Sequence, residues 1–476
     1  MHELVIRNGR VARCEGWLEA DIGIEGGRIA ALGKGLEGRR SIDAAGLWVL
    51  PGGIDAHCHL DQPSWGGADT ADDFGSGSIS AAFGGTTCLV PFAMPAPGTS
   101  AVEGLERAMA RSAGRSFVDY GFHGVVTPGT GGNVDRQVET LAARGVPSVK
   151  VFLTYEGFAA GDDLVLGLMD AARASRSTVL VHAENDAAIR RTRGRLLAAG
   201  RRSLRFHLVA GAMPAEREAT HRVATLAEIA GARAAILHVS GRQSAEEVER
   251  ARERGVAVVA ETCPQYVLLD ASVFDGPERE AARFLFSPPP RGADDNAFLW
   301  HALAEGRIAL WSSDHSPYRL ADKLPRTADA SFADAVSGVP GLETRLPLLF
   351  SEGLLAGRLS LARYLELSAE TAARLYGLDD RKGRIAVGLD ADIALWDPAA
   401  RWTVRHEDLH SNVDFSPFEG RRIRGRPVTV LLRGEPVVQD GRLVAAAPAG
   451  RFQARHRAAP DSFPIPLEEH QPWRVT

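Results

Sequence analysis

The sequence predicts an α/β protein in which a (β/α)8 barrel is joined to a small β domain built from both ends of the chain. Between residues 54 and 314, eight short apolar runs alternate with helix-patterned stretches. This alternation is typical of a parallel sheet with crossover helices. The competing arrangement is an open, doubly wound sheet, but no glycine-rich phosphate loop follows the first run.

The chain begins with short strands that predict half of the β domain. In ADIGIEGGRIAALG, alternating apolar residues flank the turn Glu25-Gly26-Gly27-Arg28. Glycine supplies the positive φ that a tight hairpin turn requires. We therefore expect an antiparallel hairpin within residues 1–52.

The expected barrel occupies residues 53–379. Its eight strands, in chain order, are IDAHCHL, TTCLVPF, DYGFHGVV, SVKVFLTY, TVLVHAE, AAILHVS, VAVVAET and IALWSSD. The stretches between them, such as DLVLGLMDAARAS and SAEEVERARERG, are apolar on one helical face. In such a barrel the functional site lies at the C-terminal ends of the strands.

Beyond residue 380 the short-strand pattern returns in KGRIAVG, ADIALWD, PVTVLLRG and EPVVQDGRLV. We expect residues 1–52 and 380–445 to close into one β domain, with the barrel inserted between its halves. Residues 446–476 show no periodicity. They are expected to form an extended C-terminal arm that packs on a neighbouring subunit, with a disordered tail as the alternative.

The composition points to a cytoplasmic protein that acts on small molecules. The 476 residues are 45% hydrophobic and 24% charged, with a net charge of −5 and no long basic run, which argues against nucleic-acid binding. Four scattered cysteines indicate reduced thiols rather than a disulfide framework. No stretch has the length and apolarity of a signal peptide or a membrane span, so no membrane partner is expected.

Polar residues able to bind metal recur at the C-terminal halves of the expected strands. His57 and His59 share one strand, and because side chains alternate faces along a strand, both imidazoles point the same way. Taken singly, each position has an ordinary explanation, such as a structural histidine or a helix cap. Their convergence on one barrel rim favours a metal site. The full set is His57, His59, Lys150, His182, His238 and Asp314.

Lys150 is the unexpected member of this set. An ammonium group would repel metal ions, and it is costly to bury without a partner. Carboxylation by CO₂ would convert it into an anionic carbamate with two oxygens. We therefore predict a carbamate on Lys150 that bridges two divalent metal ions.

Motifs that run in order along the chain, to about residue 445, support a wider interpretation. They are GGIDAHCHL, AAFGGTT, SVKVFLTYEG, VHAEN, LHVS, AETCPQYVLLD, SPPPR, SSDHSP, GVPGLETRLPLLF, LYGLDDRKGRIAVGLDADIALWDP and DFSPFEG. Together they resemble the dihydropyrimidinase and hydantoinase group of cyclic amidohydrolases, within the amidohydrolase superfamily. The resemblance implies a TIM barrel with a β-sandwich, a binuclear centre that usually holds zinc, and commonly a homotetramer.

The resemblance also assigns roles to the ligand set. His57, His59 and Asp314 would hold the more buried ion. His182 and His238 would hold the second ion, and the carboxylated Lys150 would bridge the two.

The implied reaction is hydrolysis of a C–N bond in a dihydropyrimidine or hydantoin ring to an N-carbamoyl amino acid. A hydroxide shared by the two ions would attack the ring carbonyl. Tyr155, in FLTYEG, would stabilise the developing oxyanion. Asp314 would take up a proton and pass it to the leaving nitrogen.

Substrate recognition is expected near Ser287 and Ser337, where the family holds the cyclic imide through backbone groups. Ser337 departs from the asparagine of the family pattern. Trp65 lies in a loop expected to cover the pocket, although a solvated surface loop is the alternative. The other functions considered are an allantoinase, another cyclic imide or ureide hydrolase, and a non-catalytic assembly protein, which the complete ligand set disfavours.

Overall fold

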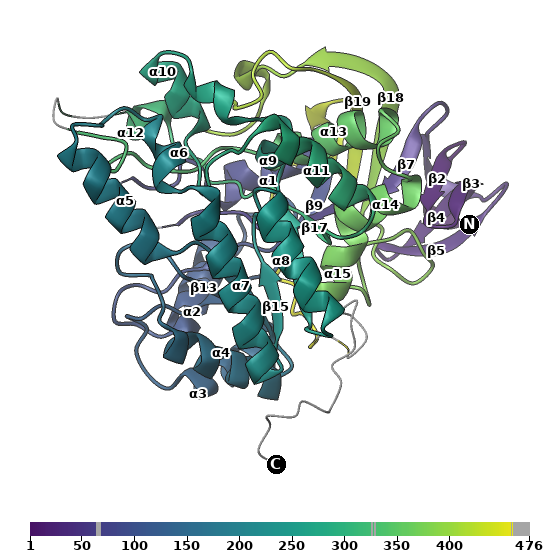
Figure 1. Cartoon of the computed structure of the whole chain (residues 1–476). Coiled ribbons are helices and arrows are strands. Elements are labelled where there is room, and N and C mark those ends of the chain that lie inside the picture. Colours follow the sequence, from purple (N-terminus) through teal and green to yellow (C-terminus); the bar gives the residue numbers. More distant parts are fainter. Residues whose placement is uncertain (63–67, 325–326, 328–329, 458, 460–476) are drawn as a thin grey trace.

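The computed structural model describes residues 1–62, 68–324, 327, 330–457 and 459, and its centre is a parallel barrel (Figure 1). Each of the eight predicted runs contains a strand. The barrel strands are β8 (Gly53–Asp55), β9 (Thr86–Leu89), β10 (Phe92–Ala93), β11 (Asp119–Tyr120), β12 (His123–Val125), β13 (Ser148–Phe152), β14 (Thr178–His182), β15 (Arg233–Ile236), β16 (Val258–Thr262) and β17 (Leu310–Trp311).

The second and third runs are each divided into two short strands, β9 with β10 and β11 with β12. Pro91 lies between β9 and β10 and has no N–H to donate to a ladder. Its carbonyl still accepts from the His123 N–H at 2.9 Å, so the second and third runs remain hydrogen-bonded across the break. The barrel closes between its first and last strands, where Cys58 pairs with His315 in a parallel bridge.

Because side chains alternate along each strand, successive residues point into the barrel and towards the surrounding helices in turn. On β13, Val149 and Val151 join the cluster that packs against the helices, whereas Phe152 joins the separate inner cluster with Leu180. Lys150 lies between the two valines and therefore points into the barrel, away from the helices.

Helices surround the barrel and follow its strands (Figure 1). The longer ones are α1 (Phe74–Phe83), α2 (Ala101–Ser112), α3 (Val134–Ala143), α4 (Asp162–Ala174), α5 (Asp186–Ala198), α7 (Met213–Ala230), α8 (Arg242–Glu253) and α11 (Ala293–Ala304). The shorter ones are α6 (Phe206–Ala210), α9 (Pro264–Leu268), α10 (Glu278–Ala281), α12 (Leu320–Lys323), α13 (Leu342–Leu348), α14 (Leu361–Leu365) and α15 (Thr371–Tyr376). Three short 3-10 helices are η1 (Ala271–Phe274), η2 (Ala282–Phe284) and η5 (His406–Asp408), and two π-helices are η3 (Leu349–Leu355) and η4 (Glu366–Glu370). None of the helices within the described ranges has the length and apolarity required to cross a bilayer.

Two sheets outside the barrel combine both ends of the chain. One sheet has the order β5-β4-β1-β6 and the other β21-β20-β19-β18-β7-β2-β3. The N-terminal strands are β1 (His2–Arg7), β2 (Arg10–Arg13), β3 (Gly16–Glu19), β4 (Asp21–Glu25), β5 (Arg28–Gly33), β6 (Gly38–Asp43) and β7 (Trp48–Pro51). The C-terminal strands are β18 (Ile393–Thr403), β19 (Arg422–Leu432), β20 (Glu435–Gln439) and β21 (Arg442–Leu443).

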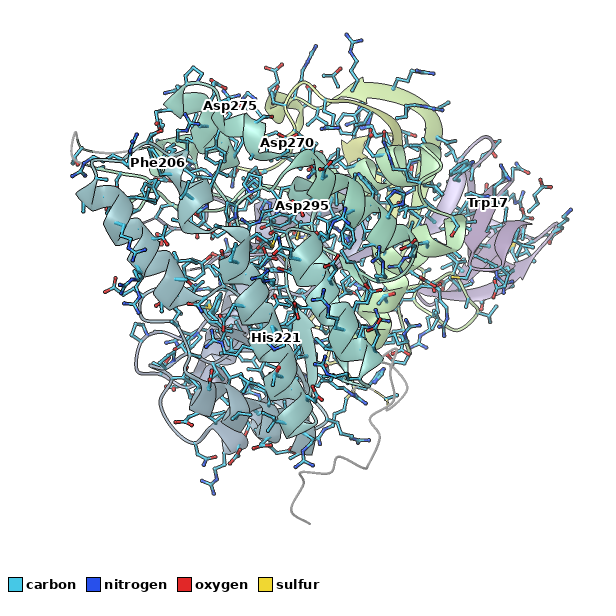
Figure 2. The ribbon with its side chains drawn as sticks, viewed as in Figure 1. Trp17, Phe206, His221, Asp270, Asp275 and Asp295 are labelled. Atoms are coloured by element: carbon cyan, nitrogen blue, oxygen red, sulfur yellow. The ribbon has the colours of Figure 1, made fainter. Side chains whose placement is uncertain are left out.

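The two ends meet where β7 pairs with β18, in the register Ile393 to Pro51. The predicted hairpin forms as β4 and β5, with positive φ at both Gly26 and Gly27. Trp17, labelled on this domain in Figure 2, packs against Trp48 with ring centroids 4.6 Å apart.

The prediction of a strand in KGRIAVG is wrong, because residues 382–388 form turns. The Lys382 ammonium is buried and donates to three carboxylates: Asp119 at 2.8 Å, Asp390 at 3.0 Å and Asp392 at 2.6 Å. These four residues form the Lys382 cluster. Asp119 lies on a barrel strand, so the cluster fastens the barrel to the segment that leads into β18.

The described part of the expected C-terminal arm packs against the barrel of its own chain. The N–H groups of Gly450, Gln453 and Arg455 donate to backbone carbonyls of Ser116, Tyr120 and Gly145, respectively. The Arg455 guanidinium is buried and donates to the Ser148 hydroxyl at 2.7 Å, at the start of β13. Residues 458 and 460–476 of the expected arm lie outside the described part of the chain.

Candidate metal centre and substrate site

The predicted metal ligands converge at the C-terminal end of the barrel. The ring centroids of His57 and His59 are 5.5 Å apart, those of His57 and His238 are 5.4 Å apart, and those of His182 and His238 are 4.4 Å apart. The Oδ1 atom of Asp314 lies 3.0 Å from His57 Nε2 and 3.2 Å from His59 Nε2. The structure thus brings these five side chains together in one place.

His57, His59 and Asp314 form a group of ligand atoms close enough to share one ion. Burial would raise the pKa of Asp314, but the charge and hydrogen bond of His57, together with His59, hold it well below its ordinary value. Burial lowers the pKa of His57, and Glu261 and Asp314 outweigh that effect and raise it to about 9. The carboxylate is therefore ionised at neutral pH, as a metal ligand must be.

His182 and His238 are buried, and burial lowers the pKa of both imidazoles. Both rings are therefore neutral at pH 7 and can offer a lone pair to an ion. The Nδ1 atom of His238 has no hydrogen-bond partner among the described residues. A buried ring nitrogen without a partner fits a ligand position.

Lys150 is buried beside these ligands, and burial lowers the pKa of its amine to about 7, with Asp314 and Glu261 acting in the opposite direction. Its Nζ atom lies 5.0 Å from the ring centroid of Phe92 and 4.7 Å from that of Phe152. A large fraction of this amine is uncharged at neutral pH. A neutral amine is the form that can react with CO₂.

Tyr155 and Ser287 are also brought together. The Tyr155 phenol is hydrogen-bonded to Ser287, and its ring centroid lies 4.9 Å from that of His182. Burial raises the pKa of this phenol well above its ordinary value. Tyr155 therefore keeps its proton and can donate it in a hydrogen bond at any working pH.

Three of the predicted site residues occupy the left-handed backbone region: Tyr155 at φ 78°, His238 at φ 40° and Asp314 at φ 48°. Non-glycine residues seldom adopt this conformation, and its energetic cost is about 1–3 kcal/mol each. Such strain concentrates at functional sites, where it fixes the direction of a side chain. Its presence at all three residues is consistent with a functional rim.

Ser337 is half-buried on a segment that runs beside the one carrying Ser287. The Gly338 N–H donates to the Leu285 carbonyl at 2.9 Å, which pairs the two segments. Within the described residues, the main-chain N–H and carbonyl groups of both serines make no hydrogen bond. These groups are available for a ligand. The last predicted substrate residue, Trp65, lies outside the described residues.

Sequence reasoning missed the residues that support these ligands. Glu261, at the end of β16, lies 2.6 Å from His57 Nδ1 and accepts from the Ser312 hydroxyl at 2.8 Å. Glu184 lies 2.7 Å from His182 Nε2. The rule that selected the histidines, a polar residue at a strand end, applies equally to Glu261. Carboxylates in this place orient metal-binding imidazoles.

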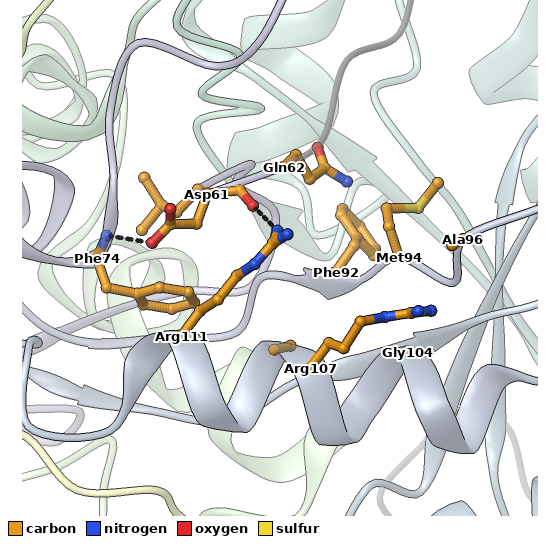
Figure 3. Close-up of a pocket in the computed structure, with 11 residues that line it drawn as sticks. Asp61, Gln62, Phe74, Phe92, Met94, Ala96, Gly104, Arg107 and Arg111 are labelled. Carbon is orange, nitrogen blue, oxygen red and sulfur yellow. Dashed lines mark hydrogen bonds between the residues drawn. The ribbon is translucent and has the colours of Figure 1, made fainter. Parts of the chain in front are cut away.

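A cavity of about 200 Å³ lies between α2 and residues 60–62. Figure 3 shows the residues that line it. Gln62 and Phe92 line it, and both also contact the metal-centre residues. The Gln62 Oε1 atom accepts from His59 Nδ1 at 2.6 Å, and the Phe92 ring centroid lies 5.1 Å from that of His59. The cavity therefore adjoins the face of His59 that is turned away from Asp314.

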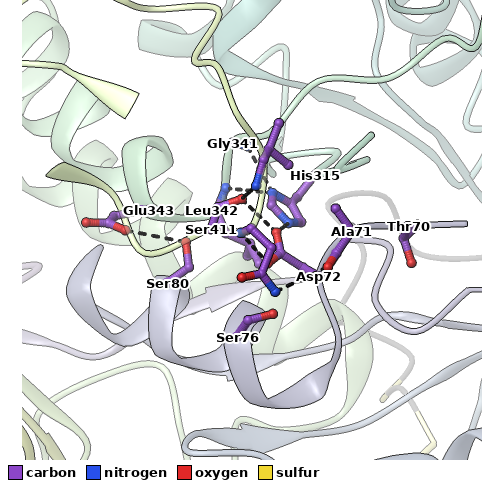
Figure 4. Close-up of polar contacts among 12 residues, drawn as sticks. Thr70, Ala71, Asp72, Ser76, Ser80, His315, Gly341, Leu342, Glu343 and Ser411 are labelled. Carbon is purple, nitrogen blue, oxygen red and sulfur yellow. Dashed lines mark hydrogen bonds and ion pairs between the residues drawn. The ribbon is translucent and has the colours of Figure 1, made fainter. Parts of the chain in front are cut away.

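His315 ties three separate segments together directly beside Asp314 (Figure 4). Its Nδ1 atom accepts the Gly341 N–H at 3.0 Å, so its Nε2 carries the proton and donates to Asp72 at 3.0 Å. Asp72 also accepts from the Ser411 hydroxyl at 2.7 Å. This Asp72–His315 network holds the loop that carries Asp314.

Asp72→Asn should destabilise the protein by about 2 kcal/mol at neutral pH. Burial would raise the pKa of Asp72, but His315 and the Asn412 N–H lower it to about 2. Because the folded pKa lies below the unfolded value, the stabilisation is present above about pH 4 and is lost as the pH falls towards 2. Thermal unfolding should therefore show a gap between wild type and variant at pH 7 that narrows below pH 4. Asp69→Asn, at an exposed site in the same loop, should show no gap; a gap constant with pH would contradict this account.

The comparisons with known proteins agree with this geometry. Residues 48–437 match the profile of the Amidohydrolase family. The chain belongs to the amidohydrolase family. Among amidohydrolases, it is 38% identical over 457 residues to the D-hydantoinase of Ralstonia pickettii, covering 96% of this chain and 99% of that one. It is 37% identical over 454 residues to the D-hydantoinase of Geobacillus stearothermophilus, covering 95% and 96% of the two chains, respectively.

A solved amidohydrolase structure shares the whole fold. The dihydropyrimidinase from Brevibacillus agri NCHU1002 matches with a TM-score of 0.92 and 36% sequence identity, over 96% of this chain and 99% of that chain. The predicted barrel with a β-sandwich from the chain ends and the resemblance to the hydantoinase group are thereby confirmed.

Proposed function

We propose that this amidohydrolase cleaves a C–N bond in a dihydropyrimidine or hydantoin ring and releases an N-carbamoyl amino acid. The observation that carries the proposal is the meeting of four histidines, Asp314 and a buried Lys150 with a lowered pKa at one barrel rim. The relatives named D-hydantoinase and dihydropyrimidinase support this choice of ring.

The residues fit a pair of divalent ions. His57, His59 and Asp314 would hold one ion, His182 and His238 would hold the other, and Lys150, carboxylated by CO₂, would serve both. The unpartnered Nδ1 of His238 and the low pKa of Lys150 support this fit. Imidazole and carboxylate ligands favour zinc. When bound, the ions would make a water-derived nucleophile available near neutral pH.

The side chains of the chain itself would supply the rest of the chemistry. Tyr155 would donate its phenol proton in a hydrogen bond to the reacting carbonyl oxygen, where negative charge develops. Asp314 would hold the proton released by the nucleophile on its carboxylate and transfer it to the leaving ring nitrogen. The backbone groups of Ser287 and Ser337 would hold the imide edge of the ring.

The assembly is proposed from the family resemblance, and the location from the composition of the chain. We infer a homotetramer in the cytoplasm, with the tetramer favoured over a dimer because of the resemblance to this group. No membrane-spanning helix occurs in the described ranges, which is compatible with that location.

Metal content and turnover, measured on one preparation, test the proposal. We expect two metal ions per chain and ring opening of both dihydrouracil and hydantoin, with loss of activity after chelation and recovery with zinc and bicarbonate. Activity on allantoin alone would replace the proposed substrates with the allantoinase alternative. A chain that binds no metal after reconstitution would contradict the enzymatic proposal and favour an assembly protein.

A further inference from the structure

Lys323, the last residue of α12, is a second buried lysine that the proposed chemistry does not use. It is 0% exposed, and it makes no ion pair with a described acidic residue. Its Nζ atom donates to the Leu285 carbonyl at 2.6 Å and to the Gly338 carbonyl, and it lies 5.4 Å from the ring centroid of Phe415. The amine is therefore held by two main-chain carbonyls and an aromatic ring.

Those two carbonyls belong to the segments that carry Ser287 and Ser337. Leu285 stands two residues before Ser287, and Gly338 directly follows Ser337. Among the described residues, the bond from the Gly338 N–H to the Leu285 carbonyl is the one main-chain hydrogen bond between these segments. The spacing of the two serines is therefore set by this one main-chain bond together with the Lys323 amine, which binds one carbonyl on each segment.

The neighbouring carbonyl is also fixed by a side chain from outside the segment. The Phe286 carbonyl lies 2.8 Å from His207 Nε2. With Leu285 held by Lys323 and Phe286 held by His207, the Ser287 N–H and carbonyl are left without an internal partner. Side chains from outside the segment therefore hold Leu285 and Phe286, whereas the main chain of Ser287 is left for the proposed contact with the ligand.

Packing alone gives no reason for an amine at this position. Burial of an amino group is costly, and an apolar side chain of similar size would avoid that cost. The carbonyls it binds lie in irregular segments rather than in a sheet. Without the amine, the Leu285 carbonyl would keep the Gly338 N–H, and the Gly338 carbonyl would have no main-chain donor among the described residues.

We propose that Lys323 is a positioning residue for substrate recognition, which sets the distance between the Ser287 and Ser337 backbones and so selects the width of the cyclic amide ring. The inference rests on the proposed function. A five-membered hydantoin and a six-membered dihydrouracil present their imide edges at different widths. The spacing of the two segments should therefore govern the preference between them.

Lys323→Met tests this, because methionine keeps much of the volume and removes the donor. We expect KM to rise about tenfold on the preferred ring, since about 1–2 kcal/mol of ordered backbone contact is lost, while kcat changes less than threefold. The ratio of kcat/KM for hydantoin to that for dihydrouracil should move towards one. A merely structural role would lower stability without changing this ratio.

Two further variants make the test decisive. Lys323→Gln keeps an N–H donor and should give intermediate KM values. If the methionine variant does not fold, the same kinetic comparison can be made with Lys323→Gln. Arg455→Met is a matched control, because Arg455 is likewise buried and donates to the carbonyls of Phe122 and Tyr376. It should lower thermal stability and leave the ring preference unchanged.

A binding measurement separates recognition from chemistry. Inhibition of metal-loaded wild type and Lys323→Met by five- and six-membered cyclic imides that are not hydrolysed should show the same loss of preference. If the wild type is active and the folded Lys323→Met variant keeps the same ring preference, the role of Lys323 is wrong and the proposed function still stands. Wild type inactive on both rings would overturn the proposed function, and this inference with it.

Discussion

Replacing Lys150 with alanine should reduce turnover by at least about a thousandfold, because several kcal/mol of transition-state stabilisation depend on the metal centre it completes. The side chain is fully buried among aromatic rings and histidines, so no other described lysine can take its place. Metal content per chain should fall in the same variant. Both quantities can be measured on one purified sample.

A short carboxylic acid should restore part of the activity of Lys150→Ala, because its two oxygens can occupy the space of the missing carbamate. Titration with formate, acetate and propionate would show saturable rescue. Lys34→Ala, at an exposed position in the β domain, is the control and should behave as wild type. Full activity of Lys150→Ala without any added acid would show that the bridging role is wrong.

Replacing Lys382 with methionine should destabilise the protein by about 3–5 kcal/mol, the usual cost of leaving buried charges without their partner. The ammonium pairs with three buried carboxylates. Its removal leaves Asp392 without an ion pair to a described residue, whereas Asp119 keeps Arg433 and Asp390 keeps Arg381. Thermal unfolding or recovery after dilution from denaturant would report the loss. Activity per folded molecule should be unchanged, because the Lys382 cluster lies apart from the metal centre.

A second substitution separates charge from packing in this cluster. Asp392→Asn in the Lys382→Met background should restore part of the stability, since Asp392 is the carboxylate that loses its only ion pair among the described residues. If the double variant were no more stable than the single one, the loss would come from the cavity instead of the charge. The Lys382 cluster would then be a packing feature.

The strand-end rule accounts for how much of the site the sequence could predict. His57, His182 and Asp314 follow apolar runs of the right length, and period-two alternation is a local property that a sequence shows directly. Glu261 obeys the same rule and was overlooked because its partner, His57, is 204 positions away in the chain. Hydrogen bonds of that range depend on barrel closure, which a local pattern does not show.

The failures of prediction have the same origin. KGRIAVG alternates like a strand, but its first residue is drawn to Asp119, which lies 263 positions earlier. The Asp72–His315 network joins residues 243 positions apart. The split of the second barrel strand could be predicted from the sequence, because Pro91 lies within the run TTCLVPF and cannot donate to a ladder. The path of residues 450–457 against the barrel was not, since that segment carries no periodicity.

The pairing of β7 with β18 imposes an order of events during synthesis. The sheet β5-β4-β1-β6 is complete once residue 43 has been made, whereas β7 waits for a partner that begins at Ile393. At typical rates of translation the ribosome needs roughly 20 to 70 s to cover that interval. During this time one edge of β7 remains open to pairing with other chains, which is a known route to aggregation. Production of this protein should therefore benefit from conditions that protect a nascent chain, such as lower temperature or added chaperones, more than from changes to the barrel itself.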